Sequence, residues 1–284
     1  MKKPQFILTA IGLLLLLALY FFANTIPSTK NISPKETAST EKEIDAHDIL
    51  QASKSKLSPG QLSYVNRLEN AVVRGDVKNQ QLESYQQLAS FWKDSVRDSF
   101  LPAAYYTGEA AKLENSEKKL TFAAQLFLNN LRGQDNPVLK GWMAKQAKEL
   151  FERALQLNPD NDSTKIGLGA SYIFGSGANG PQQEVMQGIQ KILEVAQRDS
   201  TNMYAQFMLG LGGIESGQFD KAITRLAKVV AHQPDNMEAI LNLAEAYEQR
   251  GSKAEAIKWY SEGKKLTGNQ DLIKAIDQRI KLLQ

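Results

Sequence analysis

The sequence predicts an all-α protein, a solenoid of stacked helix–turn–helix units preceded by a single transmembrane helix. Three observations lead to this fold class. A residue pattern between Met203 and Gly268 repeats itself, apolar residues recur at helical spacing after residue 49, and an uncharged apolar stretch stands near the start of the chain. Apolar residues spaced three or four apart favour amphipathic helices, and a repeat of about 34 residues is typical of stacked helix pairs.

The repeat is visible at matched positions in residues 203–268. Gly217 and Gly251 stand between two apolar stripes, where one helix must end and the chain must turn. Small residues such as Ala222 and Ala256 allow two helix axes to approach closely. The matched pairs, each 34 positions apart, are Leu209 and Leu243, Gly217 and Gly251, Ala222 and Ala256, and Ile223 and Ile257.

This pattern resembles the tetratricopeptide repeat (TPR). The residues that match the family pattern are Leu209-Gly210, Ala222, Leu226 and Pro234 in one unit, and Leu243-Ala244, Tyr247, Gly251, Ala256 and Tyr260 in the next. The departures are Gln206 and Ile240 where the family often has Trp, Gly213 where it has Tyr, and Gly268 where it has Pro. These departures leave the small and apolar residues that pack the two helices in place. The resemblance implies a superhelical solenoid.

The same pattern divides the rest of the chain. We expect residues 49–115 to be an N-terminal helical region with a degenerate repeat, 116–161 and 162–202 to be repeats with insertions, 203–236 and 237–268 to be regular repeats, and 269–284 to be a C-terminal capping helix. The first insertion is expected as an enlarged connection from Gly133 to Trp142, and the second between Tyr172 and Gly188. A helical array needs a terminal cap with a polar outer face.

The stretch Phe6–Ala23 is 18 residues without a charge, about 27 Å long as a helix. That length is near the lower limit for a membrane span, and we favour an uncleaved anchor over a cleaved signal peptide. Lys2 and Lys3 make residues 1–5 a cytoplasmic tail. The remainder then lies on the periplasmic side of a bacterial inner membrane, with the polar residues 24–48 as a flexible linker.

Composition argues against several functions. The chain has no cysteine and a formal net charge of +3, so it contains no disulfide and gives no electrostatic reason to expect nucleic acid. The G-x-G-x-x-G stretch Gly175–Gly180 follows an expected helix instead of a strand, and is better explained as a loop than as a dinucleotide site. Of two histidines, His47 is expected in the linker and His232 at a helix end. We therefore predict no catalytic, cofactor or metal site, and no enzyme.

The resemblance implies a partner-binding concave face, lined by the first helix of each repeat. An apolar groove from Ile166 to Leu211 is expected to take a helix or extended peptide of a protein partner, while the last unit is polar and acidic. The alternative, left open here, is that another part of the chain covers the groove. The expected partner-binding residues are Ile166, Ala170, Ile173, Phe174, Tyr204, Phe207, Met208, Leu211, Glu238, Asn242 and Glu245.

These expectations favour a membrane-anchored scaffold for protein–protein interaction. Family members that clamp a carboxylate carry Lys, Arg and Asn on this face, and only Asn242 resembles them. One alternative is a self-assembling structural protein, a homo-oligomer whose groove is filled by a second copy. Another is an accessory of an envelope enzyme that binds glycan or peptidoglycan through Tyr204, Trp142 and nearby acidic residues.

Overall fold

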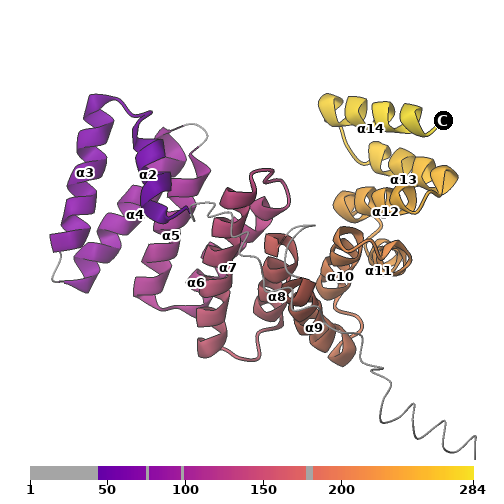
Figure 1. Ribbon diagram of the computed structural model, residues 1–284, viewed down its shortest axis with the longest axis horizontal. Coiled ribbons are helices and arrows are strands. Elements are labelled where there is room, and N and C mark those ends of the chain that lie inside the picture. Colours follow the sequence, from indigo (N-terminus) through magenta and orange to yellow (C-terminus); the bar gives the residue numbers. More distant parts are fainter. Residues whose placement is uncertain (1–43, 75–76, 97–98, 177–181) are drawn as a thin grey trace, which may run out of the picture. The chain divides into compact units, whose positions relative to one another are not determined.

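The computed structural model describes residues 44–74, 77–96, 99–176 and 182–284. These residues form thirteen helices and no strand (Figure 1). In chain order the helices are α2 (Ala46–Lys54), α3 (Pro59–Arg74), α4 (Lys78–Ser95), α5 (Phe100–Glu114), α6 (Glu117–Leu131), α7 (Pro137–Leu157), α8 (Asp162–Ser176), α9 (Gln182–Arg198), α10 (Met203–Glu215), α11 (Phe219–His232), α12 (Met237–Gln249), α13 (Lys253–Lys265) and α14 (Gln270–Leu283).

The anchor expected at Phe6–Ala23, the tail before it and most of the linker lie outside the described residues. No helix within those described is both long and apolar enough to cross a bilayer. The expected linker is too long at its end, because α2 already begins at Ala46. Asp45 caps this helix by accepting a hydrogen bond from the Asp48 backbone N–H at 2.8 Å, and His47 is an exposed residue of α2.

Helices α3, α4 and α5 form the N-terminal region. Ser58 and Gln61 make a reciprocal cap at the start of α3, because each side chain bonds the other's backbone N–H, as in the capping box. The buried side chains of this region include Val65 and Leu68 from α3, and Leu88 and Trp92 from α4. Val73, near the end of α3, is 84% exposed.

The remaining helices pack in consecutive pairs: α6 on α7, α8 on α9, α10 on α11, and α12 on α13. Each pair falls within one of the four repeat units expected from the sequence, and α14 packs against α13 in the position expected for the cap. Helix α14 contributes Ile276 and Leu283 to the core, while most of its remaining residues are exposed.

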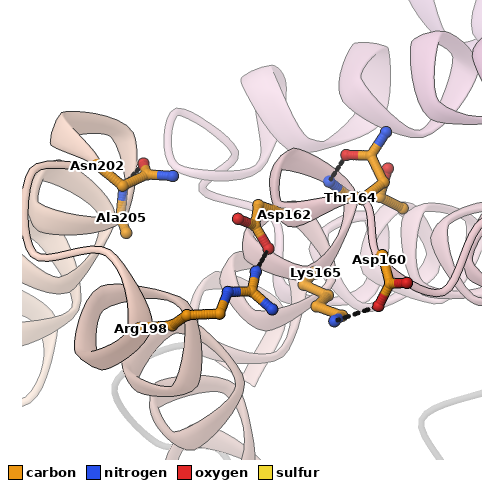
Figure 2. A network of polar contacts seen from close by, with 8 residues as sticks. Asp160, Asp162, Thr164, Lys165, Arg198, Asn202 and Ala205 are labelled. Atoms are coloured by element: carbon orange, nitrogen blue, oxygen red, sulfur yellow. Dashed lines mark hydrogen bonds and ion pairs between the residues drawn. The ribbon is translucent and has the colours of Figure 1, made fainter.

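An asparagine directly precedes the first helix of each of three successive pairs, and another precedes α14. Asn161, Asn202 and Asn236 each accept a hydrogen bond at 3.0 Å from the backbone N–H three residues later, which satisfies a donor that the helix start leaves free. Figure 2 shows the first two of these caps, with Arg198 at the end of α9 reaching Asp162 at the start of α8. Asn161 and Asn236 each end a Pro-Asp-Asn sequence, so both copies of this sequence form helix caps.

The first insertion is shorter as a loop than the sequence suggested. The connection expected from Gly133 to Trp142 spans only residues 132–136, because α7 begins at Pro137 and runs for 21 residues. Asn136 caps it by accepting from the backbone N–H groups of Val138 and Leu139, and proline suits the first helical position because it lacks an N–H. The inserted residues are thus extra turns of α7.

Two kinds of glycine position matter for this packing. Gly217 and Gly251 have φ of +70° and +86°, the left-handed conformation that glycine adopts at helix ends without steric cost. Gly175 lies within α8, and a Cβ there would stand 2.3 Å from the Cβ of Ala144 on α7. Its place in a G-x-G-x-x-G stretch is therefore explained by close helix packing, and residues 177–181 of that stretch lie outside the described part.

Candidate functional site

The first helices of the four pairs are α6, α8, α10 and α12. Their residues can be matched by counting from the first residue of each helix. We call the side that carries their ninth residues the first-helix face. The ninth residues are Gln125 on α6, Ala170 on α8, Leu211 on α10 and Glu245 on α12, and the sixth residues are Phe122, Gly167, Met208 and Asn242.

Most of the expected partner-binding residues lie in the core of the described chain. Helix α8 packs against both α6 and α10, so the apolar side chains between them are covered by the same chain. Tyr204 and Glu245 are partly buried, and Glu238 is exposed. The eight that are at most 9% exposed are Ile166, Ala170, Ile173, Phe174, Phe207, Met208, Leu211 and Asn242. In this structure they form packed interior and not an open apolar groove.

Arg132, directly after α6, reaches across this face. Its Nη2 donates a hydrogen bond to Oδ1 of Asn242 on α12 at 3.0 Å, and its guanidinium carbon lies 5.7 Å from the centre of the Phe174 ring. Its Nε is 3.9 Å from Oε1 of Glu215, which is an ion pair but too long for a hydrogen bond, and this buried Nε has no hydrogen-bond partner among the described residues. One side chain therefore joins α6 to α8, α10 and α12.

Acidic side chains surround this arginine. Burial raises the pKa of the Glu245 carboxyl above its ordinary value of 4.5, the Arg132 charge acts to lower it, and the carboxylates of Glu215 and Glu248 raise it further. Glu248 is held in place because it accepts hydrogen bonds from the Tyr260 hydroxyl at 2.9 Å and the Arg279 Nε at 2.8 Å. The arrangement is a cation among carboxylates, with Asn242 as a neutral partner.

Tyr204 lies on the same face, on α10, the first helix of the pair before α12. Burial raises the pKa of its phenol, the Glu238 charge raises it as well, and the Gln125 side chain acts in the opposite direction. The hydroxyl is buried and has no hydrogen bond of good geometry to any described residue. Gln125 of α6 and Glu238 of α12 are thus both close enough to Tyr204 to act on its phenol.

Phe122 is the largest accessible apolar side chain at these matched positions. Its ring is 59% exposed, whereas Met208 and Asn242, at the same position of α10 and α12, are buried. Phe122 and Gln125 are three residues apart on α6, so they are neighbours on its surface.

Neither Arg132 nor Phe122 was among the residues expected from the sequence. Phe122 could have been found, because it lies near the start of the repeat unit expected at residues 116–161, where the first helix of that unit must stand. Arg132 carried no such signal, because it lies outside the first helix and its partner Asn242 is 110 positions later.

The described residues give little support to sugar binding at Trp142 or to a metal site. Trp142 is only 6% exposed and its ring packs edge-on against Phe127 with 5.6 Å between centroids, so it offers no face on which a sugar could stack. No group of three or more His, Asp or Glu side chains in the part described is placed to hold a metal ion.

Comparisons with known proteins agree with the repeat pattern. Residues 214–280 match the family model described as tetratricopeptide repeat, and no curated protein matches the chain. The solved structure of PilW, described as a widely conserved type IV pilus biogenesis factor, is similar with a TM-score of 0.50 and 20% identity, over 72% of this chain and 86% of that chain.

Two further solved structures resemble the chain more distantly. MamA (residues 41 to end) from Desulfovibrio magneticus RS-1 has a TM-score of 0.45 and 18% identity, over 67% of this chain and 97% of that chain. YrrB, described as a TPR protein with an unusual peptide-binding site, has a TM-score of 0.41 and 16% identity, over 72% and 98%. The family match over residues 214–280 and the likeness to PilW support the all-helical, tetratricopeptide-type solenoid of the predicted fold class, while the predicted transmembrane helix lies outside the described residues.

Proposed function

We propose that this protein is a membrane-anchored, non-enzymatic scaffold that holds a protein partner on the periplasmic side of a bacterial inner membrane. Stacked helix pairs form extended surfaces that suit the binding of other proteins. Proteins of this fold typically act in protein–protein interaction. The observation that carries the proposal to this chain is the exposed aromatic ring of Phe122 on a first helix of the array.

The partner segment contacts the accessible part of the first-helix face. Phe122 supplies an apolar anchor, and aromatic residues are enriched in the centres of protein interfaces. Gln125 lies beside it, and Tyr204, Glu238 and Glu245 continue the face toward α12 with acidic character. This surface suits a helix or extended peptide with one apolar side chain and a nearby Lys or Arg.

The buried residues from Ile166 to Leu211 have a supporting role in this proposal. They fix α8 between α6 and α10, and a partner would reach them only by displacing contacts within the chain. Arg132 adds to this support because it ties the end of α6 to Asn242.

The membrane part of the proposal rests on the sequence alone. The uncharged stretch Phe6–Ala23 and the two lysines before it support a single span with the following chain outside the cytoplasm.

Site-specific photo-crosslinking in living cells tests the scaffold function. A benzophenone side chain placed at Phe122 is expected to capture a distinct protein. The matched control is the same group at Phe207, which is 9% exposed and should give only crosslinks within the chain. Both variants are checked by circular dichroism for unchanged helix content.

Other outcomes of this experiment would decide between functions. A crosslink from position 122 to another copy of the chain would support self-assembly instead of a partner scaffold. No crosslink between chains from position 122, or the same captured protein from both positions, would overturn the proposed docking surface.

A further inference from the structure

A groove of about 630 Å³ lies among α9, α10 and α11, away from the first-helix face. Its charged part comes mainly from α11, where Lys221, Arg225 and Lys228 are spaced by four and three residues. Residues with this spacing lie on one side of a helix. The groove is lined by Ala196, Ser200, Gln206, Asp220, Lys221, Thr224, Arg225 and Lys228.

These three cations contact only uncharged oxygen atoms. Lys221 Nζ donates to Gln218 Oε1 at 2.7 Å, Arg225 Nη1 donates to Gln206 Oε1 at 2.6 Å, and Lys228 Nζ donates to the Ser200 carbonyl at 2.6 Å. Within the described residues none of them is ion-paired to a carboxylate. Each charge is therefore positioned by the fold and left uncompensated.

The one carboxylate in the lining, Asp220, is paired with an arginine outside the groove. Asp220 accepts a hydrogen bond from Nη1 of Arg250 at 3.0 Å, and Arg250 lies outside the lining. The lining itself holds three cations and one carboxylate, a formal charge of +2. The whole chain is close to neutral for its size, with +3 over 284 residues, so this is a local concentration of charge.

The repeat fold does not require cations at these positions. One repeat later, 34 residues on, the equivalents of Lys221, Arg225 and Lys228 are Glu255, Trp259 and Glu262. Helix α13, which carries those three residues, packs on α12 as α11 packs on α10. The basic side of α11 is therefore a property of this unit and not of the packing.

We propose that this groove docks an acidic segment of a partner protein. Lys221 and Lys228 are seven residues apart, about 10 Å along the helix axis. A partner helix with carboxylates two turns apart matches this distance, as does an extended segment with carboxylates about three residues apart. The surface is separate from the one around Phe122, so either can stand without the other.

The test uses the full chain and a fluorescein-labelled helical peptide with two Glu residues two turns apart. The reference peptide has Gln in place of both Glu residues. Fluorescence anisotropy is expected to show the Glu peptide binding at least about tenfold more tightly, with affinity falling as salt screens the charges. Carbodiimide crosslinking of the bound peptide should place its carboxylates on Lys221 and Lys228.

The test variant is Lys221→Glu with Lys228→Glu, which installs residues that the next repeat already tolerates. The control is Lys253→Glu with Lys258→Glu, two exposed lysines of α13 that change the net charge by the same amount. We expect a loss of at least about tenfold in the first and less than about twofold in the second. Equal losses, no preference for the Glu peptide, or a concentration-dependent mass abolished by the first variant would overturn the proposal; the last would identify a second copy as the occupant.

Discussion

Arg132 directly follows α6, yet its guanidinium lies among residues of three later helices. Replacing it with Ala leaves Oδ1 of Asn242 without its donor and removes the ion pair with Glu215. Because unpaired buried polar groups are costly, Arg132→Ala should lower the free energy of unfolding by about 1–3 kcal/mol. Urea unfolding followed by circular dichroism measures this change.

Arg153→Ala is the matched control for that prediction. Arg153 also bonds an asparagine, its Nε donating to Oδ1 of Asn115 at 3.0 Å, but at an exposed site. Its loss should cost less than about 0.5–1 kcal/mol because water replaces the bond. Equal losses in the two variants would contradict a special role for Arg132.

Glu245 makes stability depend on pH. Its pKa in the folded chain is raised above 4.5, mainly by burial, so the folded state holds the proton more tightly than the unfolded state does. Stability contributed by this group is therefore present at low pH and is lost as pH rises through 4.5 and through the raised folded-state value.

The measurement compares the free energy of unfolding of the unmodified chain with that of the Glu245→Gln variant, by urea unfolding at several pH values. The Gln variant should gain stability relative to the unmodified chain between about pH 4 and pH 7, since Gln does not ionise. A stability difference that stays constant over this range would contradict the raised pKa.

At the scale of elements, the crossing of α8 and α9 depends on a pair of glycines. A Cβ on Gly188 would stand 2.4 Å from the carbonyl oxygen of Gly169 and 2.9 Å from the Cβ of Tyr172. These are backbone and first side-chain atoms that cannot rotate away, so the two helices would have to separate. Gly188→Ala should therefore cost about 1–3 kcal/mol.

The control is Gly141→Ala in the interior of α7, where an added Cβ has no neighbour within 4 Å. Alanine should stabilise that helix by about 0.5–1 kcal/mol because it restricts the unfolded chain. Thermal unfolding of both variants should give shifts of opposite sign. A stabilised Gly188→Ala variant would show that the crossing is looser than described.

The sequence predicts those parts of the fold that depend on local signals. The 34-residue period and the apolar stripes locate the helix pairs, because packing between neighbours fixes where small and large residues must stand. Asn136 and Pro137 are also a local start signal, and giving them weight would have placed the extra turns of α7 correctly.

The candidate site was less predictable because its contacts are long-range. Burial of Phe174 and Met208 depends on how tightly α8 packs between its neighbours. The spacing of apolar residues within one helix does not predict this packing. The contact of Arg132 with Asn242 depends on the accumulated geometry of three helix pairs. The exposure of Phe122 depends on what packs beside α6, and the residues before 116 have no clear repeat register.

At the scale of the whole chain, we expect membrane attachment through residues 6–23. Expressed in a Gram-negative bacterium, the full chain should remain in the membrane fraction after alkaline washing, and protease added outside spheroplasts should degrade it. A variant without residues 6–23 should be released into the soluble fraction with unchanged helix content. Soluble full-length chain, or protection from external protease, would contradict the proposed location.

The contact between Arg132 and Asn242 also bears on how the stack comes apart. In an array where each repeat touches only the next, terminal repeats can fray one at a time. Arg132 instead bonds a helix that lies beyond two intervening pairs, so α12 cannot leave without loosening the end of α6. We expect this bond to couple the unfolding of α12 to that of the end of α6, so that a force on the C-terminal repeats reaches a helix pair that is not their neighbour in the stack.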